Sequence, residues 1–286
     1  MSRWLRAVRS RLACAALALS ATATLACVGV PSPLAPALGG SIGVPHHGRL
    51  TGAVPLPRTG DGYRVICHDG LHFGTPRLVG ALSRAAAEVA RLRPHGAPLS
   101  ICDLSGPEGG KLARHVSHQT GRDADLLFYA LTADGRPIEV QFVRFGPDGL
   151  AEPVPGTFVR LDVERQWLLV RSLVTDPDAA VQWMFIAHPI EALLIEYARA
   201  RGEDPEILWR AEQVMIEPWD SLPHDDHLHL RLACTPEESI AGCLGGGPYW
   251  PWLPQPPQIE PMDDRELLLA IAGDLLSPLP GRLATK

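Results

Sequence analysis

Histidine and aspartate residues are concentrated in two short segments of this chain. The first segment is residues 115–125, with the sequence HVSHQTGRDAD, and the second is residues 224–229, with the sequence HDDHLH. These segments contain five of the eleven histidines in the chain. Imidazole and carboxylate groups bind metals and transfer protons, so the two segments are candidates for a metal site or for acid–base chemistry.

The spacing of these residues predicts that they share one metal site. In a strand, His227 and His229 lie on the same face, ~6.5–7 Å apart. Asp125 is the only charged residue in an apolar stretch that reads as a buried strand, and a buried carboxylate is costly unless it is paired or bound to a metal. Gly121 permits a sharp turn between His118 and Asp125. Two imidazoles and one carboxylate leave a fourth position open, which is the pattern of a catalytic zinc.

Three other interpretations of these residues are open from spacing alone. The His-x-His pair can be two surface histidines. A structural zinc can add Cys234 or Cys243, although such sites usually close with four protein ligands and the chain has no CxxC pair. Ser117 can act as a nucleophile, but it does not lie in a GxSxG turn that would support this role.

The N-terminus has the pattern of a secretory signal over residues 1–26. Four arginines precede an apolar run at Ala13–Leu25, which is too short for a membrane span of about 20 residues. Residues 24–27 (TLAC) resemble a lipobox, so a lipid anchor at Cys27 is an alternative to plain signal cleavage. We therefore expect an exported, periplasmic protein, either free or anchored to a membrane through Cys27.

Composition limits the class of protein and its partners. The chain has 286 residues, of which 46% are hydrophobic and 20% are charged, so one large domain with a packed core is expected. Removal of residues 1–26 takes away four arginines and leaves 22 basic against 32 acidic residues, a net charge of −10. Nucleic acid is excluded as a partner because binding it requires a basic face.

The four cysteines that follow Cys27 suggest two disulfides. Cys67, Cys102, Cys234 and Cys243 form an even set, and three pairings are open to them. We favour Cys67–Cys102 and Cys234–Cys243, because each of these pairs is the nearer in sequence. Free buried thiols are the alternative.

The order of predicted elements indicates an α+β domain. Thr75 is suited to cap a helix that begins at Pro76 and ends before Pro94. The other predicted helices are Glu164–Leu173, Pro189–Ala200, Pro205–Gln213 and Met262–Leu276. The predicted strands are Pro98–Asp103, Ala124–Leu131, Ile138–Arg144, Trp183–Ala187 and His227–Ala233. We expect residues 27–60 to be a Pro/Gly-rich linker, 61–245 the zinc domain, and 246–286 a Pro-rich connector with a short C-terminal helix.

The two histidine segments resemble a known signature. His118 to Asp125, followed by His227-Leu228-His229, resembles the HxxxxxxD…HxH signature of the LAS metallopeptidases. The full segments, together with residues 73–76 (FGTP) and 103–105 (DLS), resemble the penicillin-insensitive murein endopeptidase family over residues 60–245.

This resemblance implies a fold, a cofactor and a reaction. The implied fold is α+β and LAS/hedgehog-like, with a small antiparallel sheet that carries a zinc site and is flanked by helices and long loops. The implied reaction is hydrolysis of D-alanyl–meso-diaminopimelyl cross-links between peptidoglycan stem peptides. The implied zinc ligands are His118, Asp125 and His229, with His115 lining the site or adding a ligand, and the implied catalytic histidines are His227 and His224.

Roles for neighbouring residues follow as hypotheses. His227 is expected to orient the attacking water or move its proton, and His224 to assist the leaving amine. Asp225 or Asp226 either orients a histidine or is a solvated loop residue. Arg122 either binds a substrate carboxylate or forms a structural ion pair with an acid such as Asp123.

Two other functions remain open for the same residues. One is a D,D-carboxypeptidase or dipeptidase on the same scaffold, which would trim stem peptides instead of cutting cross-links. The other is a non-catalytic, zinc-bearing cell-wall binder.

Overall fold

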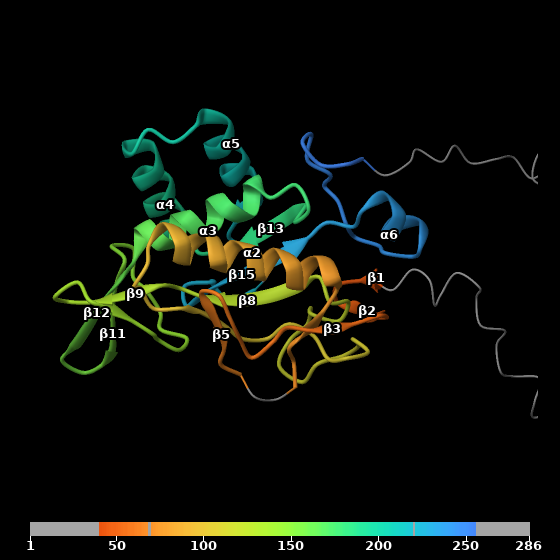
Figure 1. Ribbon diagram of the computed structural model, residues 1–286, viewed down its shortest axis with the longest axis horizontal. Coiled ribbons are helices and arrows are strands. Elements are labelled where there is room, and N and C mark those ends of the chain that lie inside the picture. Colours follow the sequence, from red (N-terminus) through yellow and green to blue (C-terminus); the bar gives the residue numbers. More distant parts are fainter. Residues whose placement is uncertain (1–39, 68–69, 220, 256–286) are drawn as a thin grey trace, which may run out of the picture.

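A computed structural model describes residues 40–67, 70–219 and 221–255 of the chain (Figure 1). The signal pattern at residues 1–26, Cys27 and the helix predicted at Met262–Leu276 lie outside these residues. Among the described helices, none combines the length and the apolar character that crossing a bilayer requires.

A seven-stranded sheet forms the centre of the molecule. Its order is β14 (Met215–Ile216), β13 (Val181–Phe185), β15 (His227–Leu232), β8 (Asp123–Leu127), β7 (Leu99–Ile101), β5 (Tyr63–Val65) and β4 (Thr59–Gly60). The central pairs are antiparallel, whereas β13 with β14 and β5 with β7 are parallel. The α+β class is confirmed, but this sheet is larger and more mixed than the small antiparallel sheet that we expected.

Helices cover one face of this sheet (Figure 1). They are α2 (Pro76–Leu92), α3 (Val163–Thr175), α4 (His188–Ala200) and α5 (Pro205–Val214), while the short α6 (Pro236–Ile240) lies beyond β15. Thr75 caps α2 by accepting a hydrogen bond from the backbone of Leu78, as its position before Pro76 predicts.

Alternation along two strands separates the core from the polar face. Leu126 of β8 and Leu228 and Leu230 of β15 are fully buried in the same apolar cluster as Leu78 and Leu82 of α2. The intervening residues of both strands point to the opposite face, because successive side chains in a strand alternate. The apolar residues are thus fixed against the helices, and the histidines and aspartates are placed together on the other side.

A second sheet projects from one end of the molecule (Figure 1). Its order is β10 (Pro137–Ile138), β9 (Ala130–Thr132), β12 (Thr157–Leu161) and β11 (Leu150–Val154). Of the strand predicted at Ile138–Arg144, only Ile138 lies in a strand, and the chain then bends through Phe142, whose φ of 46° is incompatible with a strand. The β11–β12 hairpin has no counterpart among the predicted elements.

Residues 41–60 are part of the folded domain, which corrects their assignment to a linker. They form a hairpin of β1 (Ser41–Val44) and β2 (His47–Leu50), and then β3 (Val54–Pro55), which pairs with β6 (Phe73–Gly74). The high glycine and proline content of this segment reflects tight turns: at Gly43, φ is 80° and a Cβ would lie 2.6 Å from the His47 carbonyl oxygen.

Both favoured disulfides are confirmed. Cys67 bonds to Cys102 with a Cα–Cα distance of 5.0 Å, and Cys234 bonds to Cys243 with a distance of 5.9 Å. The first bond fixes the chain immediately before Asp103, and the second fixes the segment that follows β15.

Arg122 ties the two ends of the domain to the sheet. Its guanidinium is fully buried and donates to the Ser41 hydroxyl at 3.1 Å, the Leu232 carbonyl at 2.6 Å and the Leu244 carbonyl at 3.0 Å. Burial lowers the pKa of Arg122 to about 10. The expectation that Arg122 binds a substrate carboxylate is therefore wrong, and its partners are carbonyl and hydroxyl oxygens instead of an acid.

We predict that Arg122→Met lowers the free energy of unfolding by about 3 kcal/mol, because several buried acceptors lose their donor at once. Urea denaturation followed by circular dichroism measures this change. Arg136→Met is the control, since the Arg136 side chain is 77% exposed and its loss should change stability by less than about 0.5 kcal/mol. Equal effects of the two substitutions would contradict the assigned role.

Candidate metal centre

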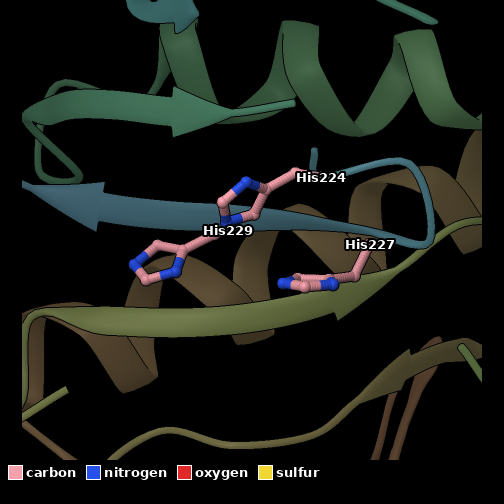
Figure 2. Close-up of side chains that lie close together, drawn as sticks. All are labelled: His224, His227 and His229. Atoms are coloured by element: carbon pink, nitrogen blue, oxygen red, sulfur yellow. The ribbon is translucent and has the colours of Figure 1, made fainter. Parts of the chain in front are cut away.

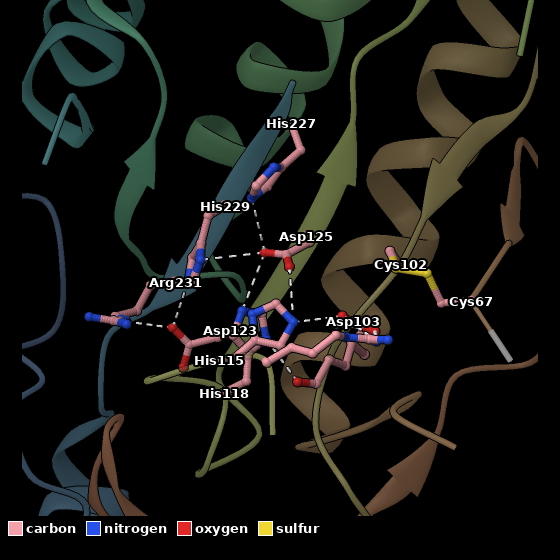
Figure 3. A network of polar contacts seen from close by, with 12 residues as sticks. Cys67, Cys102, Asp103, His115, His118, Asp123, Asp125, His227, His229 and Arg231 are labelled. Atoms are coloured by element: carbon pink, nitrogen blue, oxygen red, sulfur yellow. Dashed lines mark hydrogen bonds and ion pairs between the residues drawn. A yellow bond between two sulfur atoms is a disulfide. The ribbon is translucent and has the colours of Figure 1, made fainter. Parts of the chain in front are cut away.

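The pairing of β8 with β15 brings the two histidine segments together. In this antiparallel register His229 lies opposite Asp125, and Arg231 lies opposite Asp123. His227, His229 and His224, which precedes β15, lie close together along that strand (Figure 2). The loop before β8 returns His118 and His115 to the same place (Figure 3).

One oxygen of Asp125 is the point on which three imidazoles converge. Asp125 Oδ1 lies 3.3 Å from His118 Nε2, 3.4 Å from His229 Nδ1 and 3.6 Å from His227 Nε2 (Figure 3). Asp125 is 1% exposed and His118 is fully buried. The predicted ligands His118, Asp125 and His229 are thus brought together from β8, β15 and the loop between β7 and β8.

The geometry of this group fits a small tetrahedral cation. Ligands about 2.0–2.1 Å from such an ion lie about 3.3–3.4 Å from one another, which matches the separations of Asp125 from His118 and His229. His118 Nε2 and Asp125 Oδ1 are also buried without a hydrogen-bond partner. Since buried polar atoms are normally paired, these two atoms are suited to bind an ion.

The other nitrogen of each predicted ligand histidine has its own partner. His118 Nδ1 donates to the Leu104 carbonyl at 2.8 Å, and His229 Nε2 donates to Asp123 Oδ1 at 2.9 Å. These bonds fix the orientation of the two rings, so that the remaining nitrogens face Asp125 and, once deprotonated, present lone pairs to a metal.

The electrostatics of the group favour a bound positive charge. Burial opposes ionisation of Asp125, but the adjacent His118 and the other histidines hold the pKa of this carboxyl below its usual range. Burial also disfavours a charged His118, yet the Asp125 carboxylate raises the pKa of His118 to about 9. Burial lowers the pKa of His229 to about 4, so its imidazole is neutral at pH 7, as a metal ligand must be.

His227 is held at the edge of this group by its neighbour in sequence. His227 Nδ1 donates to Asp226 Oδ1 at 2.6 Å, which turns Nε2 toward Asp125. The hypothesis that one acid of this loop orients a histidine is confirmed for Asp226. Asp225 instead lies 3.7 Å from Arg144. Burial lowers the pKa of His227, but the hydrogen bond that its ring donates to Asp226 outweighs this effect and raises the pKa above its usual value.

His224 completes a second trio that could hold a metal. The ligand nitrogens of His224, His227 and His229 lie within 4.8 Å of one another. The ring of His224 is 5.0 Å from that of His227 and 5.8 Å from that of His229 (Figure 2). Burial and the nearby His227 lower the pKa of His224 to about 4, so this ring is neutral at pH 7.

His115 lies beside the group but uses one nitrogen elsewhere. Together with His118 and Asp125 it forms a trio whose ligand atoms lie within 4.8 Å of one another. However, His115 Nε2 donates to Asp103 Oδ2 at 2.6 Å and lies 3.9 Å from Asp125 Oδ2. Its role as an additional ligand stays a prediction, because coordination through Nε2 would require breaking the hydrogen bond to Asp103.

Two acids of the site were not recognised as such in the sequence. Asp123 precedes Asp125 by two residues and therefore shares its face of β8, a period-two signal that the sequence carried. Asp103, the partner of His115, follows β7 by two residues, and no spacing rule connects it to the histidines.

The fold and this group of residues define an α+β protein with a buried histidine–aspartate centre that could hold a metal. Comparison with known families then gives its relationship. The family model described as penicillin-insensitive murein endopeptidase matches residues 41–244, and the chain belongs to this family.

Similar proteins carry the same description. The penicillin-insensitive murein endopeptidase of Haemophilus influenzae is 30% identical over 214 residues, which cover 69% of this chain and 65% of that protein. The protein of that name in Klebsiella pneumoniae is 29% identical, covering 68% and 66%, and that of Salmonella newport is 30% identical, covering 70% and 68%. The chain thus spans about two thirds of the length of the curated relatives that it matches.

We predict that Asp123→Asn weakens metal binding roughly 10- to 100-fold, because the carboxylate that orients His229 is lost. Competition with a chromogenic chelator measures the dissociation constant. Asp134→Asn removes an acid whose side chain is 61% exposed and serves as the control. Equal metal affinity in the two variants would show that Asp123 does not support the site.

Proposed function

We propose that this chain is an exported zinc-dependent murein endopeptidase that hydrolyses D-alanyl–meso-diaminopimelyl cross-links in peptidoglycan. The observation that carries the proposal is the convergence of His118 and His229 on Asp125, with buried ligand atoms that have no hydrogen-bond partner. Membership of the family supports the reaction and the substrate.

Zinc is the metal that this set of donors suits best. Two imidazole nitrogens and one carboxylate oxygen at tetrahedral spacing are the donors of catalytic zinc sites, which keep one position open. His118, Asp125 and His229 would hold the ion. Bound there, zinc supplies a Lewis acid and lowers the pKa of water enough for nucleophilic attack near neutral pH.

His227 is placed to move the proton of the attacking water. Its Nε2 faces Asp125, its Nδ1 is fixed by Asp226, and its side chain is 18% exposed, so substrate and water can reach it. Because Asp226 makes the His227 ring more basic, this ring can hold the proton and return it to the leaving amine. His224 is neutral and offers a hydrogen bond beside it.

The cellular location that we propose is the periplasm. Two disulfides are typical of an oxidising compartment, and a murein substrate lies outside the cytoplasm. The secretory signal at residues 1–26 and the alternative lipid anchor at Cys27 stay predictions. We propose residues 41–245 as the catalytic domain, which extends the expected boundary at residue 61 to include β1–β4.

We predict that His118→Ala abolishes both zinc binding and hydrolysis, whereas His227→Ala retains zinc but loses turnover by about 10²–10⁴-fold. Metal analysis by mass spectrometry and cleavage of purified cross-linked muropeptide dimers measure the two properties. His46→Ala, at an exposed position on the turn between β1 and β2, is the matched control. Normal turnover in His227→Ala would refute the proton-transfer role.

The same assay separates the alternative functions. A D,D-carboxypeptidase or dipeptidase would release D-alanine from uncross-linked stem peptides and leave the dimer uncut. A non-catalytic binder would retain zinc and bind sacculi without releasing products. We expect the dimer to be cut to monomers, and we expect a chelator to stop this reaction until zinc is restored.

A further inference from the structure

Arg231 occupies the polar face of β15 immediately beyond the predicted metal ligand His229. The two residues are two positions apart in a strand, so their side chains emerge on the same face ~7 Å apart. Arg231 also lies opposite Asp123 across the β8–β15 pair and opposite Trp183 across the β13–β15 pair. It is therefore the cation that the sheet places beside the metal centre.

Two contacts hold the Arg231 side chain in one orientation. Its Nε donates to Asp123 Oδ1 at 2.6 Å, and its guanidinium carbon lies 5.2 Å from the centre of the Phe185 ring. Phe185 in turn lies 5.2 Å from the His229 ring, so both contacts belong to the wall of the site. An arginine fixed by one nitrogen and one ring face is pre-organised, and little conformational entropy is lost when it binds a ligand.

The outer edge of the guanidinium has no protein partner among the described residues. The only hydrogen bond and ion pair that the structure gives Arg231 run from Nε to Asp123, and the side chain is 17% exposed. Its two terminal nitrogens are thus left to donate elsewhere. Two parallel N–H donors at this spacing match a carboxylate, which they bind in bidentate fashion.

The surroundings of this edge indicate the kind of ligand. Trp183 and Phe185 lie 6.3 Å apart, ring to ring, on the adjacent strand, and Phe185 packs under the guanidinium. A site with an aromatic wall and one charged edge suits an aliphatic group that carries a carboxylate, instead of a bare inorganic anion. Peptides of this chemistry are the substrates in the proposed function.

We propose that Arg231 is a specificity-determining residue that binds a carboxylate of the murein peptide close to the scissile bond. This inference rests on the proposed function. Two carboxylates of a diaminopimelyl cross-link are candidates: the one on the carbon that bears the scissile nitrogen, and the α-carboxylate of the γ-linked glutamyl residue. The first is adjacent to the scissile amide and is the one we favour.

The test compares three muropeptide dimers, one with both carboxylates free and two in which either one is converted to an amide. We expect the wild-type protein to cleave the favoured amidated dimer roughly 10- to 100-fold less efficiently in kcat/KM than the free acid. Arg231→Gln should lose this preference, because its rate on the acid falls further than its rate on the amide. Arg231→Lys should restore part of the preference.

A binding measurement gives a readout that does not depend on turnover. Dimers in which a methylene group replaces the scissile carbonyl are titrated calorimetrically into each protein. Arg231→Gln should weaken binding of the acid analogue roughly tenfold more than it weakens binding of the amide analogue. Arg144→Gln removes another arginine near the site, one whose side chain is 63% exposed, and should retain the wild-type preference.

The outcomes separate this proposal from a supporting role and from the proposed function. If Arg231→Gln weakened all three dimers equally, Arg231 would act only through Asp123 and His229, and the proposal would be overturned. Equal cleavage and binding of all three dimers by the wild-type protein would overturn it as well. If the wild-type protein bound the acid analogue selectively but cut no dimer, the proposed function would fail while the role of Arg231 stood.

Discussion

The carboxylate of Asp125 is buried among imidazoles, and the rest of the site is arranged around the cost of placing a charge there. Asp125 is only 1% exposed, so its stabilisation comes mainly from His118, His227 and His229, and from any cation that they hold in common. This constraint explains why, in each of these histidines, the ring nitrogen that faces away from Asp125 has its own hydrogen-bond partner. If either ligand ring rotated, the charge would lose a partner that solvent cannot replace.

The hydrogen bonds that orient these rings connect the site to parts of the chain that carry no catalytic group. His118 depends on the Leu104 carbonyl, and the Cys67–Cys102 disulfide fixes the chain just before that residue. His229 depends on Asp123, which is shared with Arg231. Substrate recognition through Arg231 and ligand orientation through His229 would then pass through one carboxylate, so the two properties are physically coupled.

Sequence patterns predicted the parts of this protein that periodicity governs. The alternation in β15 and the cap and period of α2 gave the central strand and helix, and the spacing of His118, Asp125 and the HxH pair gave the convergent group. What the patterns did not give depends on long-range contacts. Residues 41–60 resemble a linker because tight turns need glycine and proline, and Arg122 resembles a ligand-binding arginine because its buried acceptors are backbone carbonyls from distant segments. The partner of His115, Asp103, was missed for the same reason.

The buried guanidinium of Arg122 has a consequence for where the two ends of the domain lie. Ser41 and Leu244, which it joins, are also the first and last residues of the family match, so the beginning and the end of the matched unit meet at one place. After Leu244 the chain continues across the domain, where Trp250 lies against Trp183 and Trp252 against Trp209. Because Ser41 and Leu244 are adjacent, the unit can be circularly permuted without separating β8 from β15, the two strands that form its site.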